Sequence, residues 1–408
     1  MKCVWIFNHY AQEPGGAGGT RHFGLAKHLR AYGWDAVVIA SSVELNTGRQ
    51  RLSDGVAFER VEYEGVPFVW VRTPEYAGNG GGRLLNMLKY AFGILDRNIL
   101  RTLPLPDAIV GSSVHPFAVV AAAFLARRYK VPLIFEVRDL WPQTLIDMGR
   151  LKRGSGLAVV MRFLERWLYR EAKKIVVLLP RAHEYIVPLG VAADKIVCIP
   201  NGVEISDRDF PVWRPVGEIF ELMYLGAHGQ ANGLECLIEA MAILNRDWPE
   251  LKVRLKLVGD GPEKPKLISL VHSKGLNNVF FQGSVPKREV PKVAGTADAF
   301  VICVRDLPGL YRYGISMNKL FDYMASARPT IIAVEAANNP IADAHAGISV
   351  RPDDPRALAS AIKDLAEMDA SEREKMGRAG WEYVNRNHSY RSLAERFSKV
   401  LDSAISCR

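Results

Sequence analysis

Short runs of apolar and β-branched residues alternate along the whole chain with longer segments of helical period. The runs are expected to be strands at Cys3–Phe7, Ala36–Ala40, Phe68–Val71, Ala108–Val110, Leu133–Val137, Ile175–Leu179, Leu222–Leu225, Val253–Val258, Val279–Phe281, Ala299–Val304, Thr330–Val334 and Ile348–Val350. Apolar strands that alternate with helices predict parallel sheets covered by helices on both faces.

The alternation starts twice, which predicts two domains. Strand Cys3–Phe7 leads into a glycine-rich loop and a helix near His22–Arg30, and strand Leu222–Leu225 leads into a second glycine-rich loop and a helix near Leu234–Leu244. An irregular stretch over residues 204–215, with two prolines and several charges, separates the two series. We therefore expect domains over residues 1–202 and 203–388, each of ordinary domain size.

Composition narrows the class of protein. The formal net charge of +9 and the pI of about 9.2 favour polyanionic partners, namely anionic lipid, nucleic acid or phosphate-bearing ligands. Nucleic-acid recognition signatures are absent. The cysteines, which lack disulfide, zinc or redox spacing, are Cys3, Cys198, Cys236, Cys303 and Cys407. A reducing cytoplasm fits this usage, and no run is long enough for a membrane span or a signal peptide.

The loop Glu13–Thr20 is the first candidate for ligand binding. It places Gly15 and Gly16 among four glycines at the first strand-to-helix turn, where backbone amides can approach an anion closely. The alternative is a plain flexible loop. The glycine spacing departs from the strict dinucleotide pattern, which argues against an NAD site.

The stretch Gly314–Ala325 is the second candidate. It follows a strand and opens a helix, so the amides from Ser316 to Lys319 could hold a diphosphate, with the Lys319 ammonium beside them. Asp322 lies one turn further on the same face. The alternative is an amphipathic helix whose charges are merely solvated. The turn Val258–Glu263 is open to both a ligand role and pure turn chemistry.

Two polar sites follow strands of the first domain. Arg138 and Asp139 come directly after strand Leu133–Val137, where α/β proteins bind ligands, although a buried structural pair would explain them equally. His115 follows strand Ala108–Val110. It could donate a hydrogen bond or transfer a proton, and a structural role is the alternative.

Two basic segments raise the possibility of membrane contact. Residues 83–101 read as a helix that combines leucines and Phe92 with Arg83, Lys89, Arg97 and Arg101. A second basic set is expected on roughly one helical face at Arg162, Arg166, Arg170, Lys173 and Lys174. The alternative in both cases is a domain helix with a solvated basic face.

These motifs, in this order, resemble the retaining glycosyltransferases of family 4, over Cys3 to about Asn387. The matching stretches are Gly15–Gly19, Arg138–Pro142, Pro200–Val203, Gly226–Gly233, Val258–Glu263, Phe281–Pro286, Asn318–Pro329, Gly347 and Arg351–Pro355. The stretches Arg138–Pro142 and Asn318–Ala325 look most like a bacterial surface-polysaccharide branch, which includes proteins assigned as N-acetylfucosamine transferases of O-antigen clusters.

The resemblance implies the α/β GT-B fold, with two Rossmann-like domains facing across a cleft. The N-terminal domain would bind the acceptor, the C-terminal domain would bind the donor, and a helix over residues 389–408 would pack back on the N-terminal domain. It also implies retention of anomeric configuration, with the leaving phosphate taking the acceptor proton, and no metal or other cofactor.

The residues expected to carry the chemistry are His115, Asp139 and Lys319. Those expected to bind the donor are Gly15, Gly16, Arg138, His228, Gly229, Asn232, Gly283, Val285, Ser316, Met317, Asn318 and Asp322. Two departures from the family pattern stand out. Gly314 replaces a sugar-contacting glutamate, and the usual diphosphate-binding cations are replaced by Ala227-His228 and Asn232. Lys319 is then the first candidate to stabilise the leaving group and Arg138 the second.

The expected function is transfer of a hexose, best assigned as an N-acetylated hexosamine from a UDP-sugar. The expected acceptor is a lipid-linked or surface oligosaccharide in O-antigen, capsule or exopolysaccharide assembly. The enzyme would be cytoplasmic, at the inner face of the cell membrane. Two alternatives stay open: a sugar-nucleotide epimerase of the same fold, and a non-catalytic nucleotide-sugar-binding partner subunit.

Overall fold

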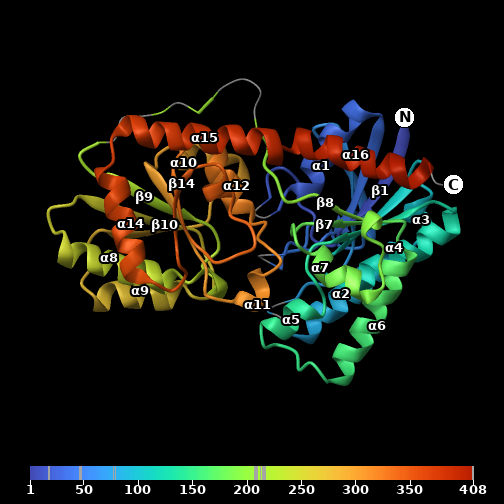
Figure 1. The fold of residues 1–408 in the computed structure, drawn as a ribbon. Coiled ribbons are helices and arrows are strands. Elements are labelled where there is room, and N and C mark those ends of the chain that lie inside the picture. The colour runs from blue at the N-terminus through green and yellow to red at the C-terminus, as the bar shows by residue number, and fades with distance from the viewer. Residues whose placement is uncertain are drawn as a thin grey trace. The chain divides into compact units, whose positions relative to one another are not determined.

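The computed structural model describes residues 1–16, 19–45, 48–76, 78, 80–205, 210–211, 213 and 217–406. The chain forms two compact units (Figure 1). Unit 1 comprises Met1–Glu204 together with Tyr390–Arg408, and unit 2 comprises Ile205–Ser389. Most of the irregular stretch expected between the domains, and Ala17 and Gly18 of the first glycine-rich loop, lie outside the described residues.

Unit 1 is built on a sheet with strand order β3-β4-β2-β1-β5-β6-β7-β8. Its strands are β1 (Lys2–Phe7), β2 (Trp34–Ser41), β3 (Phe58–Tyr63), β4 (Val66–Val71), β5 (Ala108–Ser113), β6 (Leu133–Val137), β7 (Lys174–Val177) and β8 (Ile196–Cys198). All neighbours pair in parallel except β3 and β4, which form an antiparallel hairpin.

Helices cover both faces of this sheet. They are α1 (Arg21–Leu29), α2 (Gly81–Gly93), α3 (Arg97–Leu100), α4 (Pro116–Tyr129), α5 (Gln143–Asp147), α6 (Gly156–Glu171), α7 (His183–Ile186) and α16 (Tyr390–Ser406), with 3₁₀ turns η1 (Arg30–Tyr32), η2 (Val187–Leu189) and η3 (Ala193–Lys195). Val4 and Ile6 of β1 share a core with α1 and α16, whereas Trp5 stacks edge-on against Tyr129 of α4 on the other face.

Helix α16 belongs to unit 1, although it is the last element of the chain. Gly24 of α1 allows the close approach, because a Cβ there would lie 2.1 Å from the ring of Tyr390. Leu393, Phe397 and Leu401 of α16 are almost fully buried in the same core. Burial of these side chains anchors the end of the chain to the first sheet. Residues 407 and 408 of the expected helix lie outside the described residues.

Unit 2 is built on an all-parallel sheet with strand order β11-β10-β9-β12-β13-β14. Its strands are β9 (Phe220–Leu225), β10 (Val253–Val258), β11 (Val279–Gln282), β12 (Ala299–Cys303), β13 (Thr330–Ala333) and β14 (Gly347–Val350). Its helices are α8 (Leu234–Asp247), α9 (Lys264–Ser273), α10 (Val290–Ala294), α11 (Pro308–Tyr311), α12 (Asn318–Ala325), α13 (Pro340–Asp343), α14 (Pro355–Glu367) and α15 (Ala370–His388), with η4 (Gln230–Asn232) and η5 (Lys287–Glu289). Each unit is thus a parallel-rich sheet with helices on it, the Rossmann-like architecture expected for both domains.

The single helix expected over residues 83–101 is wrong. Helix α2 ends at Gly93 and α3 begins after Asp96, whose carboxylate caps it by accepting from the Asn98 amide at 2.8 Å. Gly93 packs so closely on β4 that a Cβ would lie 2.7 Å from Val71. The chain therefore turns where the apolar pattern alone predicts a continuous helix. No helix among the described residues is both long and apolar enough to cross a membrane.

Candidate functional site

The sheet of unit 2 changes its direction of winding between β9 and β12. The connections after these two strands diverge, which opens a ligand-binding crevice at the carboxyl ends of the strands in α/β proteins. Most of the donor-binding residues predicted from the sequence lie at this edge, in loops or within η4 and α12, together with Lys319, which was predicted to carry the chemistry. They are His228, Gly229, Asn232, Gly283, Val285, Ser316, Met317, Asn318 and Asp322. The fold therefore gathers three separate segments at one edge of one sheet.

Lys319, in the first turn of α12, spans the switch point. Its ammonium donates to the hydroxyl of Tyr224 on β9 at 2.9 Å and to Oδ1 of Asn232 in η4 at 2.5 Å. It also lies 4.7 Å from the centre of the Tyr224 ring. Burial lowers the pKa of Lys319 to about 8, because both partners are neutral and neither offsets the lost hydration. An arriving anion would supply the missing counter-charge.

His228 lies on the other side of this edge and is fully buried. Neither of its ring nitrogens has a hydrogen-bond partner among the described residues. Burial and the positive charge of Lys264 lower its pKa to about 4, so the ring is neutral near pH 7. Gly259 and Gly261 make room for this residue, since a Cβ at either position would collide with the Gly226 or His228 backbone. The result is a preformed imidazole able to donate one hydrogen bond and accept another.

Asp322 is held by a lysine that was not predicted from the sequence. Lys287, in η5, approaches both carboxylate oxygens of Asp322 at 2.6 Å. Both side chains are mostly buried. The pair joins the loop after β11 to α12, so Asp322 is held in place but already has a cationic partner.

The amino terminus of α12 lacks a side-chain cap. Its N-cap residue is Met317, which makes no capping hydrogen bond, and the buried Oδ1 of Asn318 has no partner among the described residues. Uncapped amides with the helix dipole behind them form an anion site. Ser316 and Met317 supply the backbone that leads into it.

Gly314 adopts φ 108°, which residues with a side chain rarely adopt. The next residue, Ile315, is fixed by Asn338, which accepts from its amide at 2.7 Å and donates to its carbonyl at 3.2 Å. The local backbone conformation thus favours glycine at position 314, where the family has a glutamate.

The switch point of unit 1 lies between β1 and β5, and it brings together two histidines. His115 caps α4 by accepting from the Ala118 amide at Nδ1 over 3.4 Å, and its Nε2 lies 2.7 Å from Nδ1 of His9. Because Nδ1 of His115 accepts, its proton is on Nε2 and is donated to His9. Burial lowers the pKa of His115 to about 3. A neutral ring with both nitrogens engaged is suited to positioning rather than to proton transfer.

Behind the histidines, a buried carboxylate ties four segments together. Glu136, on β6, accepts from Arg21 at 2.8 Å, from the Ser112 hydroxyl at 2.5 Å, and pairs with His22 at 2.7 Å. Burial alone would raise the pKa of Glu136, but Arg21 and His22 hold it well below its usual range. Arg21 also donates to the carbonyls of Ile199 and Pro200. This network fixes the end of β6, directly before Arg138 and Asp139.

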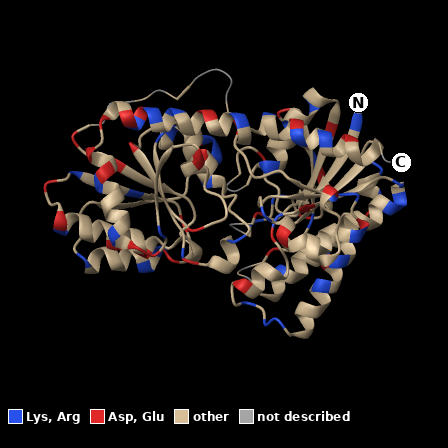
Figure 2. Ribbon diagram, in the orientation of Figure 1, with Lys and Arg blue, Asp and Glu red and all other residues tan. Residues whose placement is uncertain are grey.

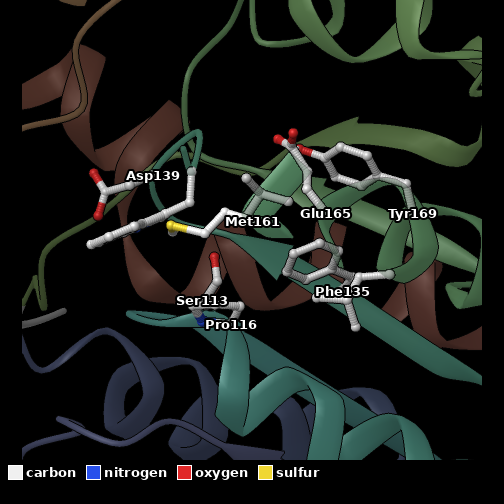
Figure 3. Close-up of a pocket in the computed structure, with 10 residues that line it drawn as sticks. Ser113, Pro116, Phe135, Asp139, Met161, Glu165 and Tyr169 are labelled. Atoms are coloured by element: carbon white, nitrogen blue, oxygen red, sulfur yellow. The ribbon is translucent and has the colours of Figure 1, made fainter. Parts of the chain in front are cut away.

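Arg138 and Asp139 attract each other electrostatically but make no close ion pair. Arg138 is partly buried and its amide donates to the Ser113 hydroxyl at 3.2 Å. Asp139 is exposed and lines a pocket of unit 1 (Figure 3). Deeper in this pocket, Glu165 accepts from the hydroxyls of Tyr169 and Tyr185, each at 3.0 Å. Burial raises the pKa of Glu165 to about 7, which makes it a titratable group that the sequence pattern did not reveal.

The described part of the first glycine-rich loop is held by contacts to Gln12 and Arg51. Gly16 packs on Gln12, since a Cβ there would lie 2.6 Å from Oε1 of Gln12, whereas nothing lies within 4 Å of a Cβ at Gly15. Arg51 anchors the loop by donating to Gln12 at 2.9 Å and to Glu13 at 2.8 Å. Among the described residues, no group of three or more His, Cys, Asp or Glu side chains could hold a metal ion.

Two Rossmann-like units, each with a topological switch point in its sheet, are the architecture of the GT-B fold. Comparison with known proteins supports a GT-B glycosyltransferase, since two family models match successive parts of the chain. Residues 16–202 match the family described as "Glycosyl transferase 4-like domain", and residues 220–368 match "Glycosyl transferases group 1".

Individual relatives are distant. The chain is 23% identical to the probable glycosyltransferase WbjE of Pseudomonas aeruginosa, over 73% of this chain and 75% of that protein. It is also 23% identical to glycogen synthase of Mycobacterium tuberculosis, over 72% and 68% of the two chains.

Solved structures share the fold along the whole chain. Sucrose-phosphate synthase of Thermosynechococcus elongatus is similar with a TM-score of 0.75 at 17% identity, covering 100% of both chains. HepE of Anabaena, in complex with UDP and glucose, gives a TM-score of 0.67 at 16% identity, covering 99% of this chain and 100% of that one. A trehalose-6-phosphate protein of Escherichia coli bound with UDP-2-fluoro glucose gives 0.71 at 12% identity, covering 98% and 99%.

Proposed function

We propose that this glycosyltransferase transfers a hexose, best assigned as an N-acetylated hexosamine, from a UDP-sugar. The proposed acceptor is a lipid-linked or surface oligosaccharide in bacterial O-antigen, capsule or exopolysaccharide assembly. Transfer would proceed with retention and without a metal. The proposal that unit 2 binds the donor rests on one observation: the Lys319 ammonium hydrogen-bonds to Asn232 and Tyr224 at the switch point of the unit 2 sheet. The UDP complexes of two structural neighbours support the choice of nucleotide.

The donor diphosphate would bind between the uncapped start of α12 and the Lys319 ammonium. Helix amides supply fixed donors, and Lys319 supplies the positive charge that the leaving phosphate needs as the sugar bond breaks. His228, being neutral, would donate a single hydrogen bond to a phosphate oxygen. Asp322 would receive the ribose hydroxyls, with Lys287 holding its carboxylate in place. Arg138 remains the second candidate cation.

In unit 1, the exposed carboxylate of Asp139 would orient the acceptor hydroxyl. The end of β6 is fixed by the buried Glu136 network, so the position of Asp139 is set by a rigid strand rather than by a free loop. His115 would act by positioning. It holds the start of α4 and the loop after β1, which carries Gly15 and Gly16.

The membrane part of the proposal is supported by apolar side chains that remain exposed on unit 1. On α2, Leu84, Leu85 and Phe92 are about half exposed or more, at 49%, 49% and 71%. Arg83 does not belong to this surface, because its guanidinium turns inward to the ring and hydroxyl of Tyr10. Of the second basic set, Lys173 precedes β7 and Lys174 opens it, so neither extends the helical face.

The test is a screen of nucleotides and nucleotide sugars by thermal shift, with NAD as a control. A ligand that binds only the folded state raises the apparent stability, and the increase grows with the logarithm of its concentration relative to its dissociation constant. We expect UDP and one UDP-sugar to stabilise the wild type, and the Lys319→Met variant to lose most of that shift. The matched control is Lys266→Met, which removes an exposed lysine of α9 that pairs with Glu235. A response to NAD alone, or to no nucleotide, would contradict the proposal.

A second assay separates transfer from the two alternatives. With the donor identified, labelled sugar is followed into a membrane-lipid fraction that supplies the acceptor. Transfer requires both donor and acceptor, whereas an epimerase converts the donor alone and a binding subunit converts nothing. The proposal predicts labelled lipid only when both substrates are present.

A further inference from the structure

A basic pocket lies at the amino-terminal edge of the unit 1 sheet, the edge opposite to the candidate site. It is formed by the end of α4, the entry to β6, the end of α6, the entry to β7 and η3. Its charged lining consists of Arg127, Lys130, Arg170, Lys173 and Lys195, with Glu171 as the one carboxylate that lines it. The cavity volume of about 410 Å³ is within the range of small-molecule sites.

The lining of this pocket holds five basic side chains and one carboxylate. Glu171 is already spanned by Arg127, at 2.8 and 2.5 Å. Lys195 donates to the backbone carbonyls of Tyr169 and Arg170, at 3.2 and 3.4 Å, which are neutral partners. Arg170 itself is exposed. A ligand carrying negative charge would therefore complete the pocket.

The pocket continues into an apolar stripe on the surface. On α6, Leu157, Val160 and Phe163 are spaced by three residues and are 61%, 63% and 74% exposed. Phe124 of α4 is 54% exposed and its ring lies 6.4 Å from that of Trp167, with Arg127 5.6 Å from the latter ring. Trp167 thus joins the stripe to the rim of the pocket.

Basic residues flank the other end of the stripe. Arg150, Lys152 and Arg153, in the loop between α5 and α6, are all exposed, and Figure 2 shows basic stretches in this loop and along α6. Apart from the terminal Glu171, the acidic residue of α6 is Glu165, which is buried and so adds no negative charge to this surface. A stripe of apolar side chains bordered by cations is the pattern of a helix that lies in a membrane interface.

We propose that the α4/α6 face of unit 1 docks on an anionic membrane, and that the basic pocket receives the phosphate of a lipid headgroup. The stripe from Leu157 to Phe163 enters the interface, and the pocket behind Trp167 takes the headgroup. The contiguity of stripe and pocket favours a lipid over a free phosphate, because a soluble anion needs only the pocket. This proposal deepens the membrane association proposed above, but it does not depend on the transferase chemistry.

The test is co-sedimentation of the full chain with vesicles of phosphatidylcholine alone, or of phosphatidylcholine and phosphatidylglycerol in equal parts. We expect binding to the anionic vesicles only. The double variant Arg170→Gln/Lys173→Gln should lower the affinity by about thirtyfold, the effect of two cations at an anionic surface. Phe163→Ser should also weaken binding. All three side chains lie at or near the surface, so the fold is expected to survive, as circular dichroism can verify.

Two matched controls are available. Arg30→Gln removes an exposed cation of η1, next to α1 on the other face of the sheet, and Phe280→Ser removes a half-exposed ring of unit 2. Both should bind vesicles like the wild type. Absence of binding to anionic vesicles, or equal binding by the double variant, would overturn the proposal. Stabilisation by inorganic phosphate, lost in the double variant and without vesicle binding, would assign the pocket to a soluble anion instead. UDP binding by the same variants should be unchanged, which separates this test from that of the transferase proposal.

Discussion

Replacing Lys319 by methionine should weaken UDP binding without unfolding the protein. Methionine keeps the length and apolar stem of the side chain and removes its charge. A hydrogen bond between an ammonium and a phosphate contributes about 1.5–3 kcal/mol. The dissociation constant for UDP should therefore rise by roughly 10- to 150-fold.

Without ligand, the Lys319→Met variant should be at least as stable as the wild type. Burial lowers the pKa of Lys319 to about 8, below its ordinary value. The folded state therefore disfavours the charged form, and wild-type stability should increase as the pH rises from about 8 toward 10.5. The Met variant should lack this increase. Loss of the bonds to Tyr224 and Asn232 offsets part of the gain near neutral pH.

The assay is isothermal titration with UDP, accompanied by urea unfolding of the unliganded proteins. Lys266→Met is the control for a surface lysine of the same unit. Unchanged UDP affinity in the Lys319 variant would refute the assignment. A large loss of stability at neutral pH would show that the residue serves the fold instead.

Three further predictions concern individual positions. Gly314→Glu, which restores the family glutamate, should lower the free energy of unfolding by about 1–3 kcal/mol because of φ 108°; an unchanged urea midpoint with tighter UDP-sugar binding would contradict this. Burial raises the pKa of the Glu165 carboxyl, so the folded state retains its proton and the wild type should become less stable as the pH rises from 4.5 to about 7. The Glu165→Gln variant should not show this decrease, and parallel stability profiles of the two proteins would refute the prediction. His115→Ala should destabilise the chain by about 1–3 kcal/mol, because it leaves the Ala118 amide and the His9 ring without partners; a preserved urea midpoint would argue against this role. The pH–activity profile of the wild type should show no step from His115 between pH 5 and 8, since the pKa of this residue is about 3.

The sequence predicted the strands that are apolar throughout, because burial on both faces leaves a continuous signal. It missed β3, an edge strand whose charged residues Glu59, Arg60 and Glu62 are exposed, and the short β8. It also joined α2 and α3 into one helix, because the break at Gly93 depends on close packing against Val71, a contact distant in sequence.

The candidate site likewise has features that the local sequence predicts and features that it does not. The uncapped start of α12 and the position of Lys319 follow from a local pattern, a strand, a loop and a helix start. The partners do not: Tyr224 and Lys287 come from other strands and loops, and only the folded sheet brings them to α12. The charged Glu136 within an apolar strand was the one local signal of the buried network in unit 1. Its partners, Arg21 and His22, are more than a hundred residues away in sequence.

The most direct test of the central claim is a crystal structure of the chain with UDP bound. The account predicts that the diphosphate lies at the amino terminus of α12, with an oxygen within hydrogen-bonding distance of the Lys319 ammonium. It also predicts that the ribose approaches Asp322. A nucleotide bound elsewhere, with Lys319 still donating only to Tyr224 and Asn232, would contradict it.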